Sequence, residues 1–297
     1  MEALEVPTRI QLKNILYATD FSAAAEVAAL YAAELAKHYG AKLHALHVRP
    51  VIVDPMSSPE NWKLIEKAAE LEAERERRKL LDKFAGIETN ILIGEGDFWP
   101  ALRGAVQEND IDLIIVGTRG RSGIRKFLLG SVAEEVVRNA TCPVLTVGPH
   151  SPSAPKAGGE INKILFATDF SPESSAAVPY AISLAQEFQA HLTLLHVITK
   201  PKTGDLVHPS ELAASSLHLL RKLVPWEAEL WCAPEYIVEQ GAAAERILEV
   251  AARQENDLIV LGVRKPAGLT GAATHLPTAT AHKVVSQAFC PVLTVRA

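Results

Sequence analysis

A glycine-rich stretch with a defined spacing is the first feature of this chain that could do chemistry. Gly117, Gly120 and Gly130 follow a short apolar run, with two residues between the first pair and nine between the second, and Ser131 comes next. Glycines let a backbone adopt positive φ and approach a ligand closely, while free N–H groups at a helix start attract an anion. The pattern predicts a phosphate-binding loop. Glycines that serve only to form turns remain the alternative.

Positive charge gathers in the same stretch of a chain whose formal net charge is −5. Arg119, Arg121, Arg125 and Lys126 lie between the second and third glycines or beside them. We expect one or two of these side chains to face a polyphosphate and the others to be solvated. The overall negative charge argues against binding to a nucleic-acid backbone.

The peptide ATDFS occurs twice, and its aspartates, Asp20 and Asp169, each end a short apolar run. A carboxylate there could accept a hydrogen bond from a ribose hydroxyl or help to hold Mg²⁺, and it is equally placed to cap the following helix. Both interpretations stay open. We expect Ser22 and Ser171 to be helix caps rather than ligands.

Histidine and cysteine suggest no catalytic centre. His47 and His196 lie at apolar strand ends without an evident partner, which favours core histidines over general bases. The three cysteines are far apart and form no CxxC pair, so neither a metal site nor a disulfide framework is expected. We predict no catalytic residue.

An internal repeat determines the elements that must position these residues. KNILYATDFS at residue 13 returns as KILFATDFS at residue 163, and TCPVLTV at residue 141 returns as FCPVLTV at residue 289. Residues 148–160 between the copies are rich in Pro, Gly and Ser. The sequence therefore predicts domains at residues 1–148 and 161–297, joined by a linker at 149–160.

Within each half, short apolar runs alternate with segments of helical period, which predicts two α/β domains with parallel five-stranded sheets. The strands expected in the first half cover residues 14–18, 42–48, 88–93, 113–117 and 144–147. Those expected in the second half cover 163–167, 191–197, 227–232, 258–262 and 292–295. Helices are expected at 23–39, 59–84, 98–108, 132–139 (capped by Ser131) and 211–223. The charged run ERERRK, at residues 74–79, is interpreted as a solvated helix face.

With ATDFS, the LHV strand end, the glycine spacing and CPVLTV in order, each half resembles the universal stress protein family, and the chain resembles its tandem form. The resemblance implies sheets of order 3-2-1-4-5 with helices on both faces, similar to adenine-nucleotide alpha-hydrolases. It also implies ATP, with Mg²⁺, as the ligand of the first half. The residues implicated by the resemblance are Asp20, Val48 through its backbone near adenine, Gly117, Gly120, Gly130, Ser131 and Val132. Arg119 joins the candidate site because of its positive charge in the loop.

The second half departs from this pattern. Gly262 opens its loop, but Lys265 stands where the next glycine is expected, and the loop is three residues longer. Thr278 and Ala279 fall where Gly and Ser are expected. Because Lys does not allow a close backbone approach, we expect weak ATP binding or none in this half.

The resemblance also implies that domains pair through their last strands, within the chain or between two chains of a homodimer. The expected function is a cytoplasmic ATP-binding protein of stress response or signalling, in which ATP changes conformation or the partner surface. The start MEALEVPTRIQLK lacks a secretory layout, and no long uncharged apolar run predicts a membrane span. The alternatives are an interaction module without nucleotide, or a slow ATPase or phosphotransferase, although the chain has no GxxxxGK[ST] loop.

Overall fold

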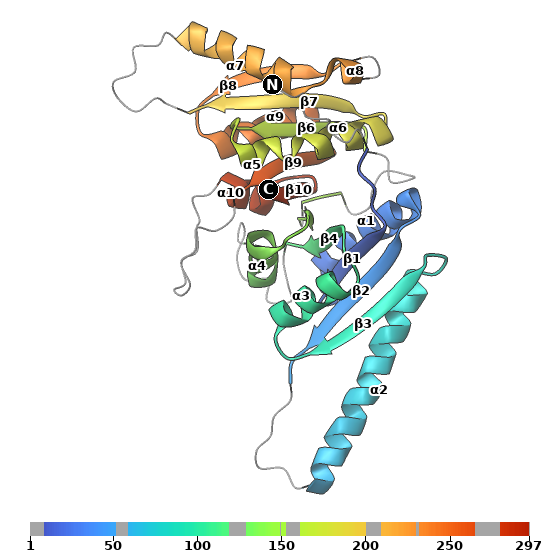
Figure 1. Cartoon of the computed structure of the whole chain (residues 1–297). Helices are drawn as coiled ribbons and strands as arrows, with labels where there is room; N and C mark the ends of the chain where they lie inside the picture. Colours follow the sequence, from blue (N-terminus) through green and yellow to red (C-terminus); the bar gives the residue numbers. More distant parts are fainter. Residues whose placement is uncertain are drawn as a thin grey trace.

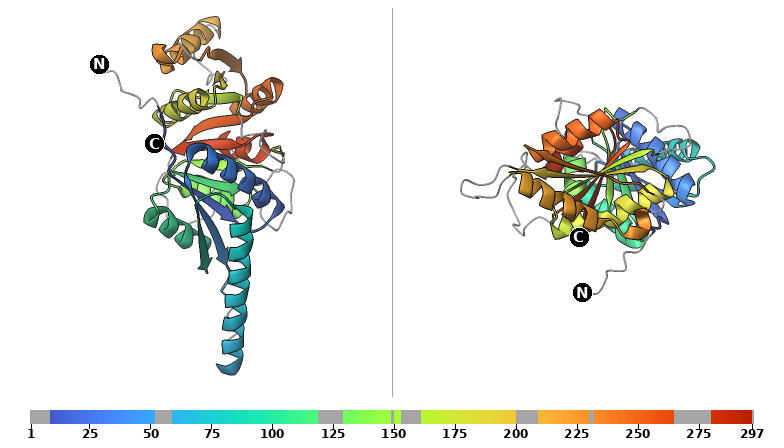
Figure 2. Two further views of the ribbon diagram at one scale, coloured as in Figure 1. Left: turned by 90° about the vertical axis from the view of Figure 1, so that its right-hand side faces the viewer. Right: turned by 90° about the horizontal axis from the view of Figure 1, so that it is seen from above.

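The two halves of the chain form one continuous sheet. The computed structural model describes residues 9–51, 59–118, 129–148, 150–152, 161–199, 209–229, 232–264 and 280–296. Within these residues the strands follow the order β3-β2-β1-β4-β5-β10-β9-β6-β7-β8 (Figure 1). Each half therefore has the order 3-2-1-4-5, and helices cover both faces (Figure 2). The α/β class and this order are confirmed.

Most elements lie where the apolar periodicity predicts them. The strands are β1 Asn14–Thr19, β2 Lys42–Arg49, β3 Thr89–Glu95, β4 Leu113–Gly117, β5 Val144–Val147, β6 Lys163–Thr168, β7 His191–Ile198, β8 Glu235–Gln240, β9 Leu258–Val263 and β10 Val292–Arg296. The helices are α1 Ala23–Tyr39, α2 Pro59–Lys83, α3 Phe98–Glu108, α4 Ser131–Asn139, α5 Pro172–Ser175, α6 Val178–Glu187, α7 Pro209–Leu223, α8 Trp226–Glu229, α9 Ala243–Gln254 and α10 Thr280–Gln287. No helix in this part of the chain is both long and apolar enough to cross a membrane.

The helix α1 shows how local sequence builds the layer beside the first strand. Ser22 is its N-cap and accepts a hydrogen bond from the backbone N–H of Ala25. Gly40 ends the helix in the left-handed region, with φ of 60°. Apart from Leu35, the buried face is made of small residues, which let the helix lie close to the sheet: Ala25, Ala28, Ala29, Ala32 and Ala36.

The last strands of the two halves pair with each other inside the chain. β5 and β10 are antiparallel, with Leu145 opposite Leu293, whereas the other neighbouring strands of the sheet are parallel. Thr146 Oγ1 donates to the carbonyl oxygen of Val292 at 3.0 Å, across this seam. Of the two pairings left open by the sequence, the structure has the one within the chain, and the edges that it leaves open are β3 and β8.

One predicted strand is wrong. Residues 227–232 do not form the third strand of the second half, because Trp226–Glu229 is the short helix α8, which follows Pro225. The strand is β8, Glu235–Gln240. It carries charged residues at its outer positions because it lies at an edge of the sheet, and this polarity conceals it in the sequence.

Asn256 is a buried polar residue at a place where the other half has an apolar one. Its side chain is 7% exposed, and neither amide atom has a hydrogen-bond partner among the described residues. The equivalent position is Ile111, since each precedes an aspartate, Asp112 or Asp257, that accepts backbone N–H bonds from the start of the first strand of its half. A buried amide without partners lowers stability.

Replacing Asn256 by Ile, as in the first half, should therefore raise the free energy of unfolding by about 1 to 2 kcal/mol. Urea unfolding followed by circular dichroism measures the change. The matched control, Ile111→Asn, should lower the same quantity by a larger amount, because it adds an unpaired amide to a packed core. A loss of stability in Asn256→Ile would contradict the account, since it would mean that the amide makes a stabilising hydrogen bond.

Candidate functional site

Three neighbouring strand ends bring the predicted ligand-binding residues to one edge of the sheet. β1 lies between β2 and β4, all parallel, so Asp20, Val48 and Gly117 lie at or just past the same carboxyl edge. The backbone N–H of Gly130 donates to the carbonyl oxygen of Thr118 at 2.8 Å, which ties the start of α4 to the end of β4. This edge is where open parallel sheets bind ligands.

The helix α4 begins at this edge with a glycine rather than with a polar cap. Gly130 is the N-cap, with φ of −64°, and offers no side chain to the first turn. Ser131 is the first helical residue, so the prediction that it caps the helix is wrong. Val132 follows and is 42% exposed. Arg119 and Gly120, the other two predicted ligand residues, lie outside the described residues.

Among the described loop glycines, Gly117 acts through packing and not through positive φ. Neither Gly117 nor Gly130 adopts a positive φ, which corrects that part of the prediction. A Cβ atom on Gly117 would lie 2.8 Å from the backbone carbon of Ala24, at the start of α1. At Gly262 it would lie 2.2 Å from the carbonyl oxygen of Glu173, at the start of α5. In each half this glycine therefore lets the first helix approach the fourth strand.

The TDFS peptide forms a hydrogen-bonded turn that presents Asp20. Thr19 Oγ1 accepts from the N–H of Phe21 at 3.0 Å, and Asp20 Oδ1 accepts from the N–H of Ser22 at 2.9 Å. Ser22 then caps α1, as predicted. Phe21 has φ of 58°, a left-handed conformation that is uncommon for a bulky residue and is found at functional sites. The second half repeats the turn with Thr168, Asp169, Phe170 and Ser171.

His47 lies beneath this turn and is held on two sides. Its Nδ1 is 2.7 Å from the carbonyl oxygen of Thr19 and must carry the proton, because a carbonyl only accepts. The Phe21 ring lies 4.7 Å from the imidazole, centroid to centroid. The histidine is thus a satisfied structural residue, as predicted, and His196 makes the same contact with Thr168 at 2.9 Å.

The prediction that His47 has no partner is wrong. Its Nε2 is 3.5 Å from Oε1 of Glu76, and both side chains are buried. Glu76 belongs to the run ERERRK, whose other residues are exposed, as expected for a solvated face. Among the roles that sequence reasoning missed are those of Glu76, Thr19 and Phe21. The duplication of TDFS marks the last two, whereas nothing in the charge pattern marks Glu76.

The equivalent edge of the second half carries more negative charge, and an arginine lies across it. Arg264 Nη2 is 3.6 Å from Asp169 Oδ2, and its Nε is 3.8 Å from Glu173 Oε2. Glu173 occupies the position of Ala24 in the first half. Partial burial opposes the ionisation of Asp169, but hydrogen bonds from Ser171 and Ser174 and the charge of Arg264 outweigh it and lower the pKa of this carboxyl.

The described residues hold no ready-made metal cluster, and their thiols are unreactive. These residues contain no group of three or more His, Cys, Asp or Glu side chains that could hold a metal ion. All three cysteines are free, and burial raises the pKa of Cys142 and of Cys290 to about 12. Such thiols stay protonated near neutral pH and are poor nucleophiles.

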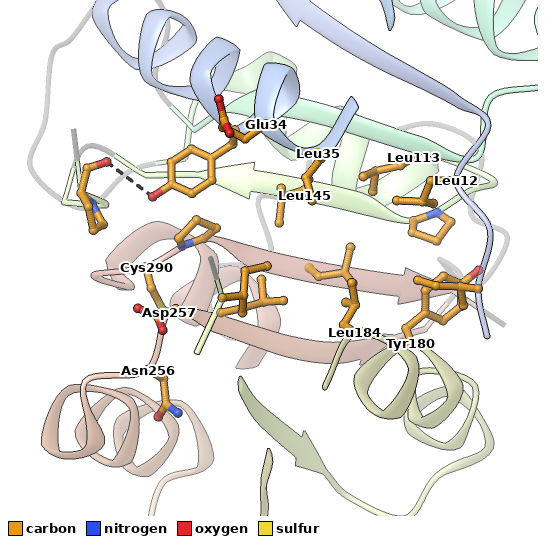
Figure 3. A pocket seen from close by; sticks show the side chains of 18 of the residues that line it. Leu12, Glu34, Leu35, Leu113, Leu145, Tyr180, Leu184, Asn256, Asp257 and Cys290 are labelled. Carbon is orange, nitrogen blue, oxygen red and sulfur yellow. Dashed lines mark hydrogen bonds between the residues drawn. The ribbon is translucent and has the colours of Figure 1, made fainter. Parts of the chain in front are cut away.

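An apolar cavity of about 90 Å³ lies at the seam between the halves (Figure 3). Equivalent residues of the two halves line it in pairs: Tyr31 and Tyr180, Leu35 and Leu184, Leu113 and Leu258, and Leu145 and Leu293. Leu12 and Leu113 are at the amino ends of β1 and β4, so the cavity lies away from the edge that carries Asp20 and Gly117. It is a gap in the packing between the halves and is separate from the predicted ligand site.

Comparison with known proteins agrees with this duplicated architecture. The sequence model of the universal stress protein family matches residues 11–148 and, separately, 160–296. The chain belongs to the universal stress protein family. A universal stress protein of Methanocaldococcus jannaschii is 35% identical over 141 residues, which are 46% of this chain and 81% of that protein. One from Mycobacterium tuberculosis is 25% identical over 292 residues, covering 95% of this chain and 97% of that one.

Solved structures show the same fold over the whole length of the chain. The crystal structure of a universal stress protein from Archaeoglobus fulgidus has a TM-score of 0.72 at 21% identity, and covers 97% of this chain and 99% of that one. A functionally unknown protein from Pseudomonas aeruginosa has a TM-score of 0.57 at 18% identity, covering 96% and 92%. The tandem arrangement of two universal stress protein domains is therefore an arrangement that other proteins share.

Proposed function

We propose that the first domain binds ATP, with Mg²⁺, and that the second does not. ATP would change the conformation or the partner surface of the tandem unit, in a stress response or signalling role. The observation that carries this proposal is the convergence of Asp20, Val48, Gly117 and the start of α4 on one carboxyl edge.

In this proposal each group at the edge contacts one part of the nucleotide. The phosphates lie at the start of α4, where Gly130 leaves the first turn without a side-chain cap, and along the loop that carries Arg119 and Gly120. The ribose lies at Asp20, which the TDFS turn holds at the end of β1. The adenine lies against the backbone of Val48, on the neighbouring strand.

In the second domain, negative charge at the equivalent carboxyl edge disfavours the binding of a polyphosphate. Two carboxylates, Asp169 and Glu173, lie there instead of the one in the first half, and Arg264 lies 3.6 Å and 3.8 Å from them. Lys265 adds to this difference by replacing the glycine of the first half. These differences support the proposal that the first domain binds ATP and that the second domain does not.

An enzymatic role is the second candidate function. Hydrolysis or transfer of a phosphoryl group needs a residue that positions water or an acceptor. The only acid–histidine pair near this edge in the described residues is Glu76 with His47, and it is buried beneath Phe21. We therefore propose nucleotide binding without an enzymatic role, and phosphate release no faster than the uncatalysed rate in a malachite-green assay is the expected result.

A matched pair of substitutions tests the ligand site. Asp20→Asn should weaken Mg-ATP binding about tenfold, because the carboxylate loses a charge-assisted hydrogen bond to the ribose. Asparagine keeps the side-chain oxygen that accepts from Ser22, so the turn is preserved. The affinity is read from the displacement of a fluorescent ATP analogue.

The control is Asp169→Asn, which makes the same change in the same turn of the second domain. It should leave the affinity unchanged within a factor of about two. Equal losses in the two variants would show that the turn matters to the fold and not to the ligand. A loss confined to Asp169→Asn would place the site in the second domain and overturn the proposal.

A further inference from the structure

The helix α2 extends beyond the body of the first domain. It has 25 residues, which is about 37 Å of helix, whereas its counterpart α7 in the second domain has 15. Near its carboxyl end, Leu80 is buried in the core, as is Phe84 just after the helix. Glu76, one turn before Leu80, contacts His47. Towards the amino end, Arg49 contacts the carbonyl oxygen of Ala69. Beyond that contact α2 runs away from the sheet (Figure 2).

The projecting part exposes an apolar stripe on the side that faces away from the body. Leu64 is 66% exposed and Leu71 is 57% exposed, and Ala68 between them is also exposed. The spacing of four and then three residues places the three side chains on one face of the helix. Arg75, one turn further on, continues that face and is exposed. Leu64 and Leu71 are two helical turns apart, and with Ala68 between them they form a continuous exposed apolar face, which favours a contact surface.

Charge is divided between the two ends of the same helix. Residues 59–74 carry five acidic and two basic side chains, and residues 75–83 carry five basic and two acidic ones. Two copies of α2 laid antiparallel would place the acidic end of each beside the basic end of the other. A parallel pair would place like charges together. The charge distribution therefore complements itself in the antiparallel arrangement alone, as a two-fold interface requires.

We propose that α2 is the contact through which two copies of this chain associate, as an antiparallel helix pair. A pair centred between Ala68 and Leu71 brings Leu71 of each copy against Ala68 of the other and Lys67 opposite Glu72. The last strands are already paired inside the chain, so this contact is distinct from the strand pairing of the two domains.

Analytical ultracentrifugation of the full chain across micromolar concentrations tests the association. The wild type should show a concentration-dependent dimer that weakens as salt is added. Leu64→Glu with Leu71→Glu should raise the dimer dissociation constant at least about tenfold. The control is Leu219→Glu on α7, which is 44% exposed and should leave association unchanged.

A charge exchange separates a specific contact from a folding defect. One variant is Glu72→Lys and the other is Lys67→Glu, both at exposed positions that the antiparallel pair places opposite each other. Each variant alone should associate more weakly than the wild type, because like charges then meet at positions 67 and 72. An equimolar mixture should form the heterodimer. A wild-type monomer at every concentration overturns the proposal, and so does a dimer that these substitutions do not affect, which would use the sheet edges.

Discussion

Gly262→Ala should lower the free energy of unfolding by about 3 kcal/mol, near the upper end of what overpacking usually costs. The added Cβ would lie 2.2 Å from the carbonyl oxygen of Glu173 and 2.3 Å from the Cα of Ser174. These are backbone atoms, so no side-chain rotation can relieve the overlap. The start of α5 must move away from β9 instead. Urea unfolding followed by far-UV circular dichroism measures the loss.

Gly104→Ala is the matched control for this substitution. Gly104 lies inside α3, and the nearest atom to an added Cβ is a carboxylate oxygen of Glu108 at 3.8 Å. Alanine should therefore stabilise the protein, by up to about 1 kcal/mol, through its higher helix propensity. If Gly262→Ala unfolded at the same urea concentration as the wild type, the close approach of α5 to β9 would be contradicted.

Gly120→Lys should reduce the affinity of the first domain for Mg-ATP about a hundredfold, or ~2.7 kcal/mol. The substitution copies Lys265 of the second domain into the first. A lysine at this position prevents the close approach of the loop backbone to the phosphates, and the loss of such charge-assisted bonds is costly. Isothermal titration calorimetry of the variant measures the change.

The control for the added charge is Gly104→Lys, on α3 of the same domain, where the nearest atom to an added Cβ is a carboxylate oxygen of Glu108 at 3.8 Å. It should leave ATP affinity unchanged within a factor of about two. An undiminished affinity in Gly120→Lys would remove the glycine loop from the binding site. A loss in both variants would attribute the effect to net charge rather than to position 120.

The strands inside the sheet were predictable because buried parallel strands are continuous apolar runs in the sequence. Their order within each half was implied only by the resemblance to the universal stress protein family. The edge strand Glu235–Gln240 was not predictable, because an edge strand tolerates charge and the neighbouring run at 227–232 is more apolar. The pairing of β5 with β10 could be predicted only as one of two arrangements. An unpaired edge requires a partner strand, but nothing in its sequence says which chain supplies the partner.

At the ligand edge, the sequence indicated the residue types but not how they act. Gly117 was recognised as important, yet it admits the backbone of α1, which a glycine spacing cannot distinguish from an approach to a ligand. Glu76 lies in a run of charges and looks like its exposed neighbours. Only the three-dimensional structure shows that Glu76 lies on the face of α2 that contacts His47. The contact of Arg264 with Glu173 could not be predicted either, because the two residues are close in space but far apart along the chain.

The number of ATP molecules bound per chain tests the central claim most directly. Isothermal titration of the purified, nucleotide-stripped protein with Mg-ATP should give one site per chain, held by the first domain. Two sites would contradict the account, because the second domain would then bind ATP in spite of Lys265, Glu173 and Arg264. No binding at all would contradict it too, and would make the protein an interaction module that does not use a nucleotide.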